Sequence, residues 1–299
     1  MTTSISREMI DAAGRAKALL GASAGAVAGF YASRLCANGG FPDRAGKSDL
    51  YYTVFGIQAS AALGAALPVD RVAAYLASFG TGGGLDLLHL SCLARCWASL
   101  PGARPPAGLR EEALGRLAAC RTPDGGYAQQ PGAPAGSAYG CFLALGTYQD
   151  VGADLPDPGG CAACLEFLAV GDGSYANDAA LLFGSVPATA AAATVLRHLH
   201  CPVPPEAARW LIDQQADDGG FLAVPVSPES DLLSTATALH ALALLGADLS
   251  AVRGPCLRFV QSLRKPDGSF SGHLGDDVPD CEYTCYALLA LGHLAGEDG

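Results

Sequence analysis

Aspartates that open similar apolar segments are the residues of this chain best suited to do chemistry. The openings read Asp49-Leu-Tyr-Tyr52-Thr53, Asp86-Leu-Leu-His89, Asp231-Leu-Leu-Ser234-Thr235 and Asp280-Cys-Glu-Tyr283-Thr284. If these segments start together at one end of the molecule, their carboxylates gather on one rim. Two carboxylates at a dry rim push one pKa upward, which suits acid–base work, and oxygen-only ligands suit magnesium. The four aspartates therefore predict a reactive rim.

A structural role explains the same four aspartates. An aspartate in front of a helix accepts hydrogen bonds from the first free backbone amides and favours the positive end of the helix dipole. Each aspartate taken alone is therefore expected to be a helix N-cap. The two roles are compatible, because a cap and a rim residue occupy the same place.

The elements that carry these aspartates repeat along the chain. A glycine turn that ends in an aromatic residue or leucine occurs six times, and its last residue is Phe41, Leu85, Tyr127, Tyr175, Phe221 or Phe270. The period of 42 to 49 residues is long enough for two helices and two connections. A fixed period of this size is typical of repeated units that bury their apolar faces against one another.

Two kinds of helix are expected to alternate between the turns. Segments before the turns, such as 109–121 and 205–217, mix charged and apolar residues, as helices with one face in solvent do. Segments after the turns, such as 50–67, 137–148 and 232–246, contain no charge and are expected to be buried on every side. We therefore predict an all-α fold: a closed α/α toroid of six helix pairs, with parallel inner helices, forming one domain over residues 1–299.

Composition narrows the classes of partner and location. Half of the residues are hydrophobic and only 16% are charged, which fits a compact body. The net charge of −11 argues against nucleic acid and anionic membrane as partners, and the apolar runs are too short to span a bilayer. Eleven cysteines, with Arg7 and Glu8 where a secretory signal would be apolar, predict reduced thiols in the cytoplasm.

The repeated motifs resemble those of the superfamily of protein prenyltransferase β subunits and squalene cyclases. The resemblance covers residues 20 to 295 and rests on the turns Pro123-Asp-Gly-Gly-Tyr127, Gln214-Gln-Ala-Asp-Asp-Gly-Gly-Phe221 and Pro266-Asp-Gly-Ser-Phe270, together with openings such as Ser48-Asp-Leu-Tyr-Tyr-Thr53 and Tyr283-Thr-Cys-Tyr286. It implies the α/α toroid, a hydrophobic isoprenoid substrate and, as in the β subunits, a helical partner subunit. The motifs are specific for the fold and weak for the reaction, because fold does not fix function.

The catalytic zinc of the β subunits is not expected here. The resemblance implies ligands from an aspartate, a cysteine two residues later and a histidine in the next repeat. Asp231 matches the aspartate, but Leu233 and Tyr283 occupy the other two positions. One ligand of three is too few for a catalytic zinc.

The rim acids offer other chemistry under the same resemblance. The Asp-x-Asp-Asp acid motif of the cyclases does not occur, but Asp276-Asp277-Val278-Pro279-Asp280 matches the magnesium–diphosphate motif of ionising terpene synthases. Pro279 makes a polar rim loop the alternative, since proline breaks a helix. We predict Asp231 and Asp280 as catalytic residues, and Asp276, Asp277 and Asp280 as magnesium ligands.

Aromatic residues near the rim suit an isoprenoid chain, because their faces could stabilise carbocations. We predict that the substrate contacts Tyr51, Tyr52, Phe55, Tyr139, Phe142, Tyr283 and Tyr286. His240, within an apolar stretch, is interpreted as a hydrogen-bonded core histidine. The leading hypothesis is an enzyme that transfers or cyclises a prenyl substrate in the central barrel, and the alternative is a non-catalytic toroid that binds a lipid or protein partner.

Overall fold

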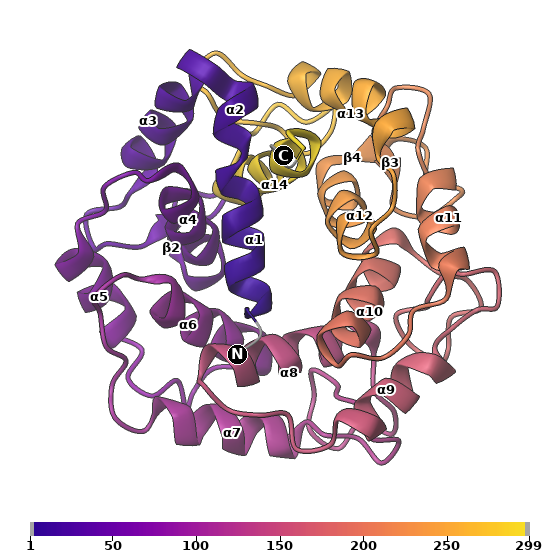
Figure 1. Cartoon of the computed structure of the whole chain (residues 1–299). Helices are drawn as coiled ribbons and strands as arrows, with labels where there is room; N and C mark the ends of the chain where they lie inside the picture. The colour runs from indigo at the N-terminus through magenta and orange to yellow at the C-terminus, as the bar shows by residue number, and fades with distance from the viewer. Residues whose placement is uncertain (1–2, 297–299) are drawn as a thin grey trace.

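Two concentric rings of helices form the molecule (Figure 1), which a computed structural model describes over residues 3–296. The inner ring consists of α4 (Leu50–Leu63), α6 (Leu87–Ser99), α8 (Ala138–Asp150), α10 (Val186–His198), α12 (Leu232–Leu244) and α14 (Cys281–Leu294). The outer ring consists of α3 (Ala24–Arg34), α5 (Val69–Ala77), α7 (Leu109–Ala119), α9 (Pro158–Phe167), α11 (Pro205–Asp213) and α13 (Ser250–Ser262). Two short antiparallel pairs, β1 (Phe41–Pro42) with β2 (Ser48–Asp49) and β3 (Phe221–Leu222) with β4 (Ser230–Asp231), lie in the connections.

The inner ring is closed. Each inner helix packs against the next, and α14 packs against α4, so the last repeat contacts the first. Tyr31 Oη of α3 donates to the Cys281 carbonyl at 2.9 Å, which joins the same two repeats in the outer part of the ring. The all-α toroid of six helix pairs is therefore confirmed.

The glycine turns hold each outer helix against the next repeat. Gly219 has φ 93°, and a Cβ there would lie 2.3 Å from the Pro255 carbonyl oxygen, so only glycine fits. Phe221, at the end of that turn, is fully buried. Its N–H donates to Thr235 Oγ1 at 2.9 Å, which ties the turn to the first turn of α12. The same bond joins Phe41 to Thr53, Tyr175 to Thr189 and Phe270 to Thr284.

The four aspartates are N-caps, as expected for each of them alone. In every case the side chain accepts a hydrogen bond from the backbone N–H three residues later: Asp49 from Tyr52, Asp86 from His89, Asp231 from Ser234 and Asp280 from Tyr283. All four lie at the end of the barrel where the inner helices begin. We call this end the mouth.

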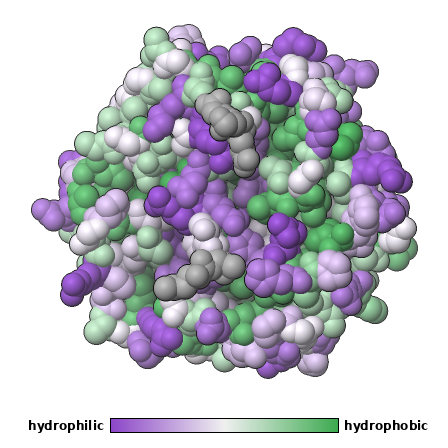
Figure 2. Space-filling view, in the orientation of Figure 1, coloured by the Kyte–Doolittle hydropathy of each residue, from purple (hydrophilic) through white to green (hydrophobic). Residues whose placement is uncertain are grey.

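An N-terminal helix that the sequence analysis did not anticipate closes the opposite end. Helix α1 (Ile5–Gly14) is followed by α2 (Ala16–Leu20) and the 3-10 turn η1 (Gly21–Ser23), and it lies inside the ring, against the ends of the inner helices (Figure 1). The Ile5 N–H donates to Gln149 Oε1 near the end of α8 at 2.9 Å, and Arg15 Nε donates to the Gly292 carbonyl of α14 at 3.3 Å. Figure 2 shows side chains filling the centre of this face. We call this end the floor.

Two further expectations concern cysteines and membranes. All eleven cysteines are unpaired and eight of them are buried, as expected of small core residues. Within residues 3–296, no helix combines the length and apolar character needed to cross a membrane.

Candidate active site in the central barrel

A cavity lies inside the inner ring, and the helical repeat explains which residues line it. Five inner helices, all but α14, present their second residue nearest the mouth. All six present their fifth or sixth residue deeper, and all but α8 present their ninth residue at the floor. These positions lie on one helical face. The nearest level holds Tyr51, Leu88, Tyr139, Pro187 and Leu233; the middle level includes Phe55, Cys92, Phe142, Ala191, Thr237 and Tyr286; the deepest holds Gln58, Arg95, Thr194, His240 and Leu289. Met9, Ile10 and Ala13 of α1 complete the floor.

The cavity opens at the mouth and not at the floor. Its inner part has a volume of about 150 Å³ and shares Tyr51, Leu88 and Tyr139 with an outer part of about 380 Å³. The outer part is also lined by Asp49 and His89 of the capping segments. A ligand that reaches the inner cavity by this route therefore passes between the first turns of α4, α6 and α8.

Six of the seven aromatic residues predicted from the sequence line this route. Tyr51, Phe55, Tyr139, Phe142 and Tyr286 line the inner part, and Tyr52 lines the outer part. The ring centroids of Tyr51 and Phe55 are 5.1 Å apart, and those of Phe55 and Tyr286 are 5.5 Å apart, so the rings form one continuous wall. Tyr283 lines neither part: its ring packs beneath Arg44, whose guanidinium carbon lies 5.3 Å from the ring centroid.

Glu282 is a carboxyl group at the mouth that the sequence analysis overlooked. It is the second residue of α14, so it occupies the same level as Tyr51 and Tyr139. Tyr51 Oη donates to Glu282 Oε1 at 2.6 Å. Burial raises the pKa of Glu282 from 4.5 to about 7, and the hydrogen bond from Tyr51 offsets only part of that rise. Glu282 therefore holds its proton to a higher pH than a free glutamate does. Its side chain does not itself line the cavity, but it is bonded to Tyr51, which does.

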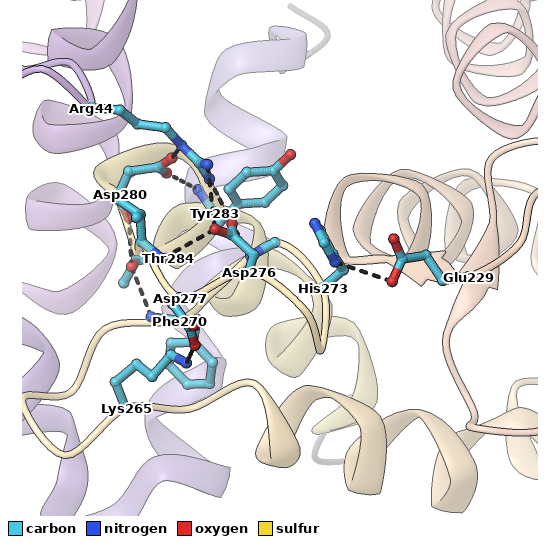
Figure 3. Close-up of polar contacts among 12 residues, drawn as sticks. Arg44, Glu229, Lys265, Phe270, His273, Asp276, Asp277, Asp280, Tyr283 and Thr284 are labelled. Atoms are coloured by element: carbon cyan, nitrogen blue, oxygen red, sulfur yellow. Dashed lines mark hydrogen bonds and ion pairs between the residues drawn. The ribbon is translucent and has the colours of Figure 1, made fainter.

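The acidic loop before α14 is held by an arginine from the first repeat (Figure 3). Arg44 Nε donates to Asp280 Oδ2 at 2.7 Å, and Arg44 Nη2 donates to Asp276 Oδ2 at 2.7 Å. The pKa of Asp276 is lowered, because hydrogen bonds from Arg44 and two backbone amides outweigh its burial. Asp277 points elsewhere: its side chain is 98% exposed and lies 3.9 Å from Lys265 Nζ.

These contacts do not assemble the magnesium site predicted from Asp276, Asp277 and Asp280. Within residues 3–296, no three His, Cys, Asp or Glu side chains are grouped so that they could hold a metal ion. The physical reason is that Arg44 already neutralises two of the carboxylates, while the third is in solvent.

The residues at the zinc positions of the β subunits do not form a ligand set either. Asp231 Oδ1 accepts from Ser234 N and Oδ2 accepts from Ser234 Oγ, both at 2.7 Å, so both oxygens serve the cap. Burial raises the pKa of Asp231, and no second carboxylate contributes to the rise. Leu233 is an apolar wall residue of the cavity, and Tyr283 is covered by Arg44. The expectation of no zinc stays a prediction, which elemental analysis of the purified protein would test.

The interpretation of His240 as a hydrogen-bonded core residue is confirmed only in part. His240 is buried and its Nδ1 lies 3.0 Å from His293 Nε2, but its own Nε2 has no hydrogen-bond partner, and the residue also lines the cavity. The signal that could have found it is its register, because His240 is the ninth residue of α12, as Gln58 and Arg95 are of their helices. The same register identifies Glu282.

Comparison with known proteins agrees with the fold. The model of the prenyltransferase alpha-alpha toroid domain family matches residues 76–169 and 183–297. No curated protein matches the sequence. Among solved structures, a protein from Actinoplanes is 18% identical, covers 92% of this chain and 100% of its own, and has a TM-score of 0.58.

Structures of a terpene cyclase are similar to the chain over almost its whole length. Variants of the type II terpene cyclase MstE from Scytonema, bound to the product merosterolic acid A or to the substrate geranylgeranyl dihydroxybenzoate, are each 14% identical. Each covers 94% of this chain and 97% of its own, with TM-scores of 0.63 and 0.60. At this identity the likeness shows a shared fold.

Proposed function

Because the chain belongs to the prenyltransferase alpha-alpha toroid domain family, we propose that it binds an isoprenoid chain in its central cavity and cyclises it, with Glu282 as the proton donor. The observation that carries this proposal is the 2.6 Å hydrogen bond from Tyr51, which lines the aromatic cavity, to the carboxyl group of Glu282. Its pKa of about 7 lies near neutral pH, where a general acid works best.

The reaction needs only groups that the chain supplies. Glu282 transfers its proton to a terminal double bond of the isoprenoid, which leaves a carboxylate on the protein and a tertiary cation on the substrate. Tyr51 Oη is already placed to stabilise that carboxylate by its hydrogen bond. The faces of Phe55 and Tyr286 stabilise the cation while further double bonds attack it. Loss of a proton from the cyclic cation ends the sequence, so the product is an isomer of the substrate.

Exclusion of water supports the same reaction. A carbocation reacts with water unless the site keeps water out. Helix α1 closes the floor with Met9, Ile10 and Ala13, and apolar side chains line most of the wall. The solved relative MstE acts on a geranylgeranyl compound, which makes such compounds the first substrates to try.

Glu282 is favoured over the two aspartates predicted from the sequence because of their hydrogen bonds. Asp231 uses both oxygens to cap α12, and Asp280 uses one for its cap and the other for Arg44. Neither carboxylate can act without breaking a structural contact. Glu282 has one hydrogen bond, from Tyr51, and caps no helix.

The test is turnover by the Glu282→Gln variant with geranylgeranyl dihydroxybenzoate or geranylgeranyl diphosphate. Glutamine keeps the shape and can still accept from Tyr51, but it has no proton to give. We expect turnover to fall about 10²–10⁴-fold while binding stays within a few fold. The matched control is Glu229→Gln, which changes a half-exposed rim carboxylate paired with His273 (Figure 3) and should leave turnover unchanged. Equal turnover by both variants would contradict the proposal.

A second candidate function, a non-catalytic toroid that binds a lipid or protein partner, is favoured by one observation. Leu182 and Val226 are about nine-tenths exposed, and both lie in loops that lead to the mouth, before α10 and α12. Such residues mark a surface that contacts another body. Prenyl binding without any turnover, equally strong in the wild type and Glu282→Gln, would support this candidate.

A further inference from the structure

The floor of the cavity is polar, in contrast to its wall. Gln58, Arg95 and His240 lie at the same level on α4, α6 and α12, and all three line the cavity. Gln58 and His240 are each only 5% exposed. Buried polar side chains cost free energy unless they are hydrogen-bonded, so three of them at one level need an explanation.

Two of these side chains each have a nitrogen without a partner. Gln58 Nε2 and His240 Nε2 are buried nitrogens with no hydrogen-bond partner. Apolar residues of similar size would fill the same positions without this penalty. Neither nitrogen contributes to the fold, and neither takes part in the proposed proton transfer at the mouth. A group that is absent from the folded chain alone, but present in a bound ligand, would satisfy them.

Arg95 adds a cation to the same level. Its side chain is 16% exposed and forms an ion pair with Asp150, whose Oδ2 lies 3.6 Å from Arg95 Nε. Asp150 also accepts from Ser6 Oγ of α1 at 3.1 Å. A Cβ at position 146 would lie 3.3 Å from Arg95 Nη2, so Gly146 leaves the guanidinium its space. The fork of N–H donors on Arg95 is thus held at the floor and remains able to bind an oxygen.

We propose that the floor binds an oxygen function, a carbonyl or carboxylate, at the leading end of the isoprenoid ligand. The amide of Gln58 and the guanidinium of Arg95 present N–H donors, so the complementary ligand group is an acceptor oxygen. This inference rests on the proposed function, since the ligand must occupy the cavity. It adds that the substrate is a prenyl compound with a polar head and not a plain hydrocarbon.

The direction of the ligand follows from the closed floor. Helix α1 blocks entry from that end, so the ligand enters through the mouth with its oxygen end first. With the oxygen at the floor, the chain runs along Phe142 and Tyr286 toward Tyr51, whose hydroxyl is bonded to Glu282. The floor subsite therefore places the double bond that the acid protonates.

The experiment compares three C20 prenyl ligands of the same chain: the carboxylic acid, the aldehyde and the hydrocarbon. Dissociation constants are measured for the wild type, Gln58→Leu and Ser60→Ala. Leucine removes the unpartnered amide at nearly constant volume. Ser60→Ala is the matched control, because it changes a residue of the same helix that does not line the cavity and removes a hydroxyl already bonded to the Gly56 carbonyl at 2.7 Å.

We expect the acid and the aldehyde to bind the wild type more tightly than the hydrocarbon, and Gln58→Leu to weaken both about tenfold while leaving the hydrocarbon within twofold. A larger loss for the acid identifies a carboxylate, and equal losses identify a carbonyl. Ser60→Ala should change none of the constants. Without ligand, Gln58→Leu should unfold about 2 °C or more above the wild type, because a buried unpartnered amide is gone.

The outcomes separate this inference from the function on which it rests. If the three ligands bind alike and Gln58→Leu changes none of them, the floor subsite is refuted, while an apolar prenyl site at the mouth stands. If no prenyl ligand binds, both the subsite and the proposed function fail.

Discussion

The mouth and the floor of the barrel both carry polar residues, but the carboxylates of the mouth are paired, whereas two cavity-lining side chains of the floor each keep a nitrogen without a partner. At the mouth, Asp231 and Asp280 cap helices, and Arg44 neutralises the acidic loop. At the floor, Gln58 and His240 each keep a buried nitrogen unbonded. This difference shows that the number of acidic residues on a rim is weak evidence for a functional site. Buried polar groups that have no hydrogen-bond partner within the fold are stronger evidence.

Glu282 is the residue of the mouth that, like the polar residues of the floor, caps no helix. Its position in the first turn of α14 faces the cavity level of Tyr51, whereas the capping aspartate lies two residues earlier and turns back to the helix end. Burial raises the pKa of this carboxyl group, which caps no helix. We therefore propose a structural role for the aspartates and a chemical role for the glutamate.

The largest expected effect comes from a substitution that displaces helix α1 from the floor. In Gly292→Ala, the new Cβ would lie 1.8 Å from the Ala12 carbonyl oxygen, so α1 must move away from α14. We expect the free energy of unfolding to fall by about 1–3 kcal/mol and prenyl binding to weaken, as measured by denaturant unfolding and titration.

The matched control for the floor is Gly115→Ala on the outer helix α7, where a Cβ meets nothing within 4 Å. Alanine favours the helix there, so stability should rise by about 0.5–1 kcal/mol. If Gly292→Ala behaves like this control, α1 does not close the barrel as described.

A pH profile sharpens the contrast at the mouth. The pKa of Glu282 is raised to about 7, so turnover should be full below pH 7 and fall about tenfold per pH unit above it. A wild-type turnover that is flat from pH 6 to 9 would refute the acid assignment.

The same pKa makes the free energy of unfolding depend on pH. Between pH 4.5 and 7 the folded state holds the Glu282 proton and the unfolded state does not, so the stability contributed by Glu282 is complete below pH 4.5 and is lost as pH rises toward 7. The free energy of unfolding of Glu282→Gln should lack this pH-dependent part.

The smallest effect is expected at a cap. In Asp231→Asn, asparagine still caps α12, so stability should change by about 1 kcal/mol or less. Turnover should stay within a few fold of the wild type, because Asp231 caps a helix and gives no proton in the proposed reaction. Turnover measured for this variant and for Glu282→Gln decides which of the two carboxyl groups is the proton donor. A loss from Asp231→Asn as large as that from Glu282→Gln would return the catalytic role to the rim aspartates.

The sequence predicted the fold well because the signals for it are periodic. The glycine turns repeat at near-equal spacing, and buried turn aromatics such as Phe221 and Phe270 explain why. Helix α1 was missed because it lies outside the repeat. The site was predicted only in part. The aromatic wall follows from the local spacing of residues along each helix. The hydrogen bonds by which Arg44 occupies Asp276 and Asp280 could not be predicted, because they join the first and last repeats, more than 230 positions apart.

Turnover in D₂O tests the central claim most directly. If Glu282 starts the reaction by protonating a double bond, the exchangeable proton comes from solvent. The cyclic product made from geranylgeranyl dihydroxybenzoate should then carry one deuterium on carbon, which mass spectrometry detects as an increase of about one mass unit over the product made in H₂O. A cyclic product without solvent deuterium, or one that forms from geranylgeranyl diphosphate only with loss of diphosphate, would contradict the account.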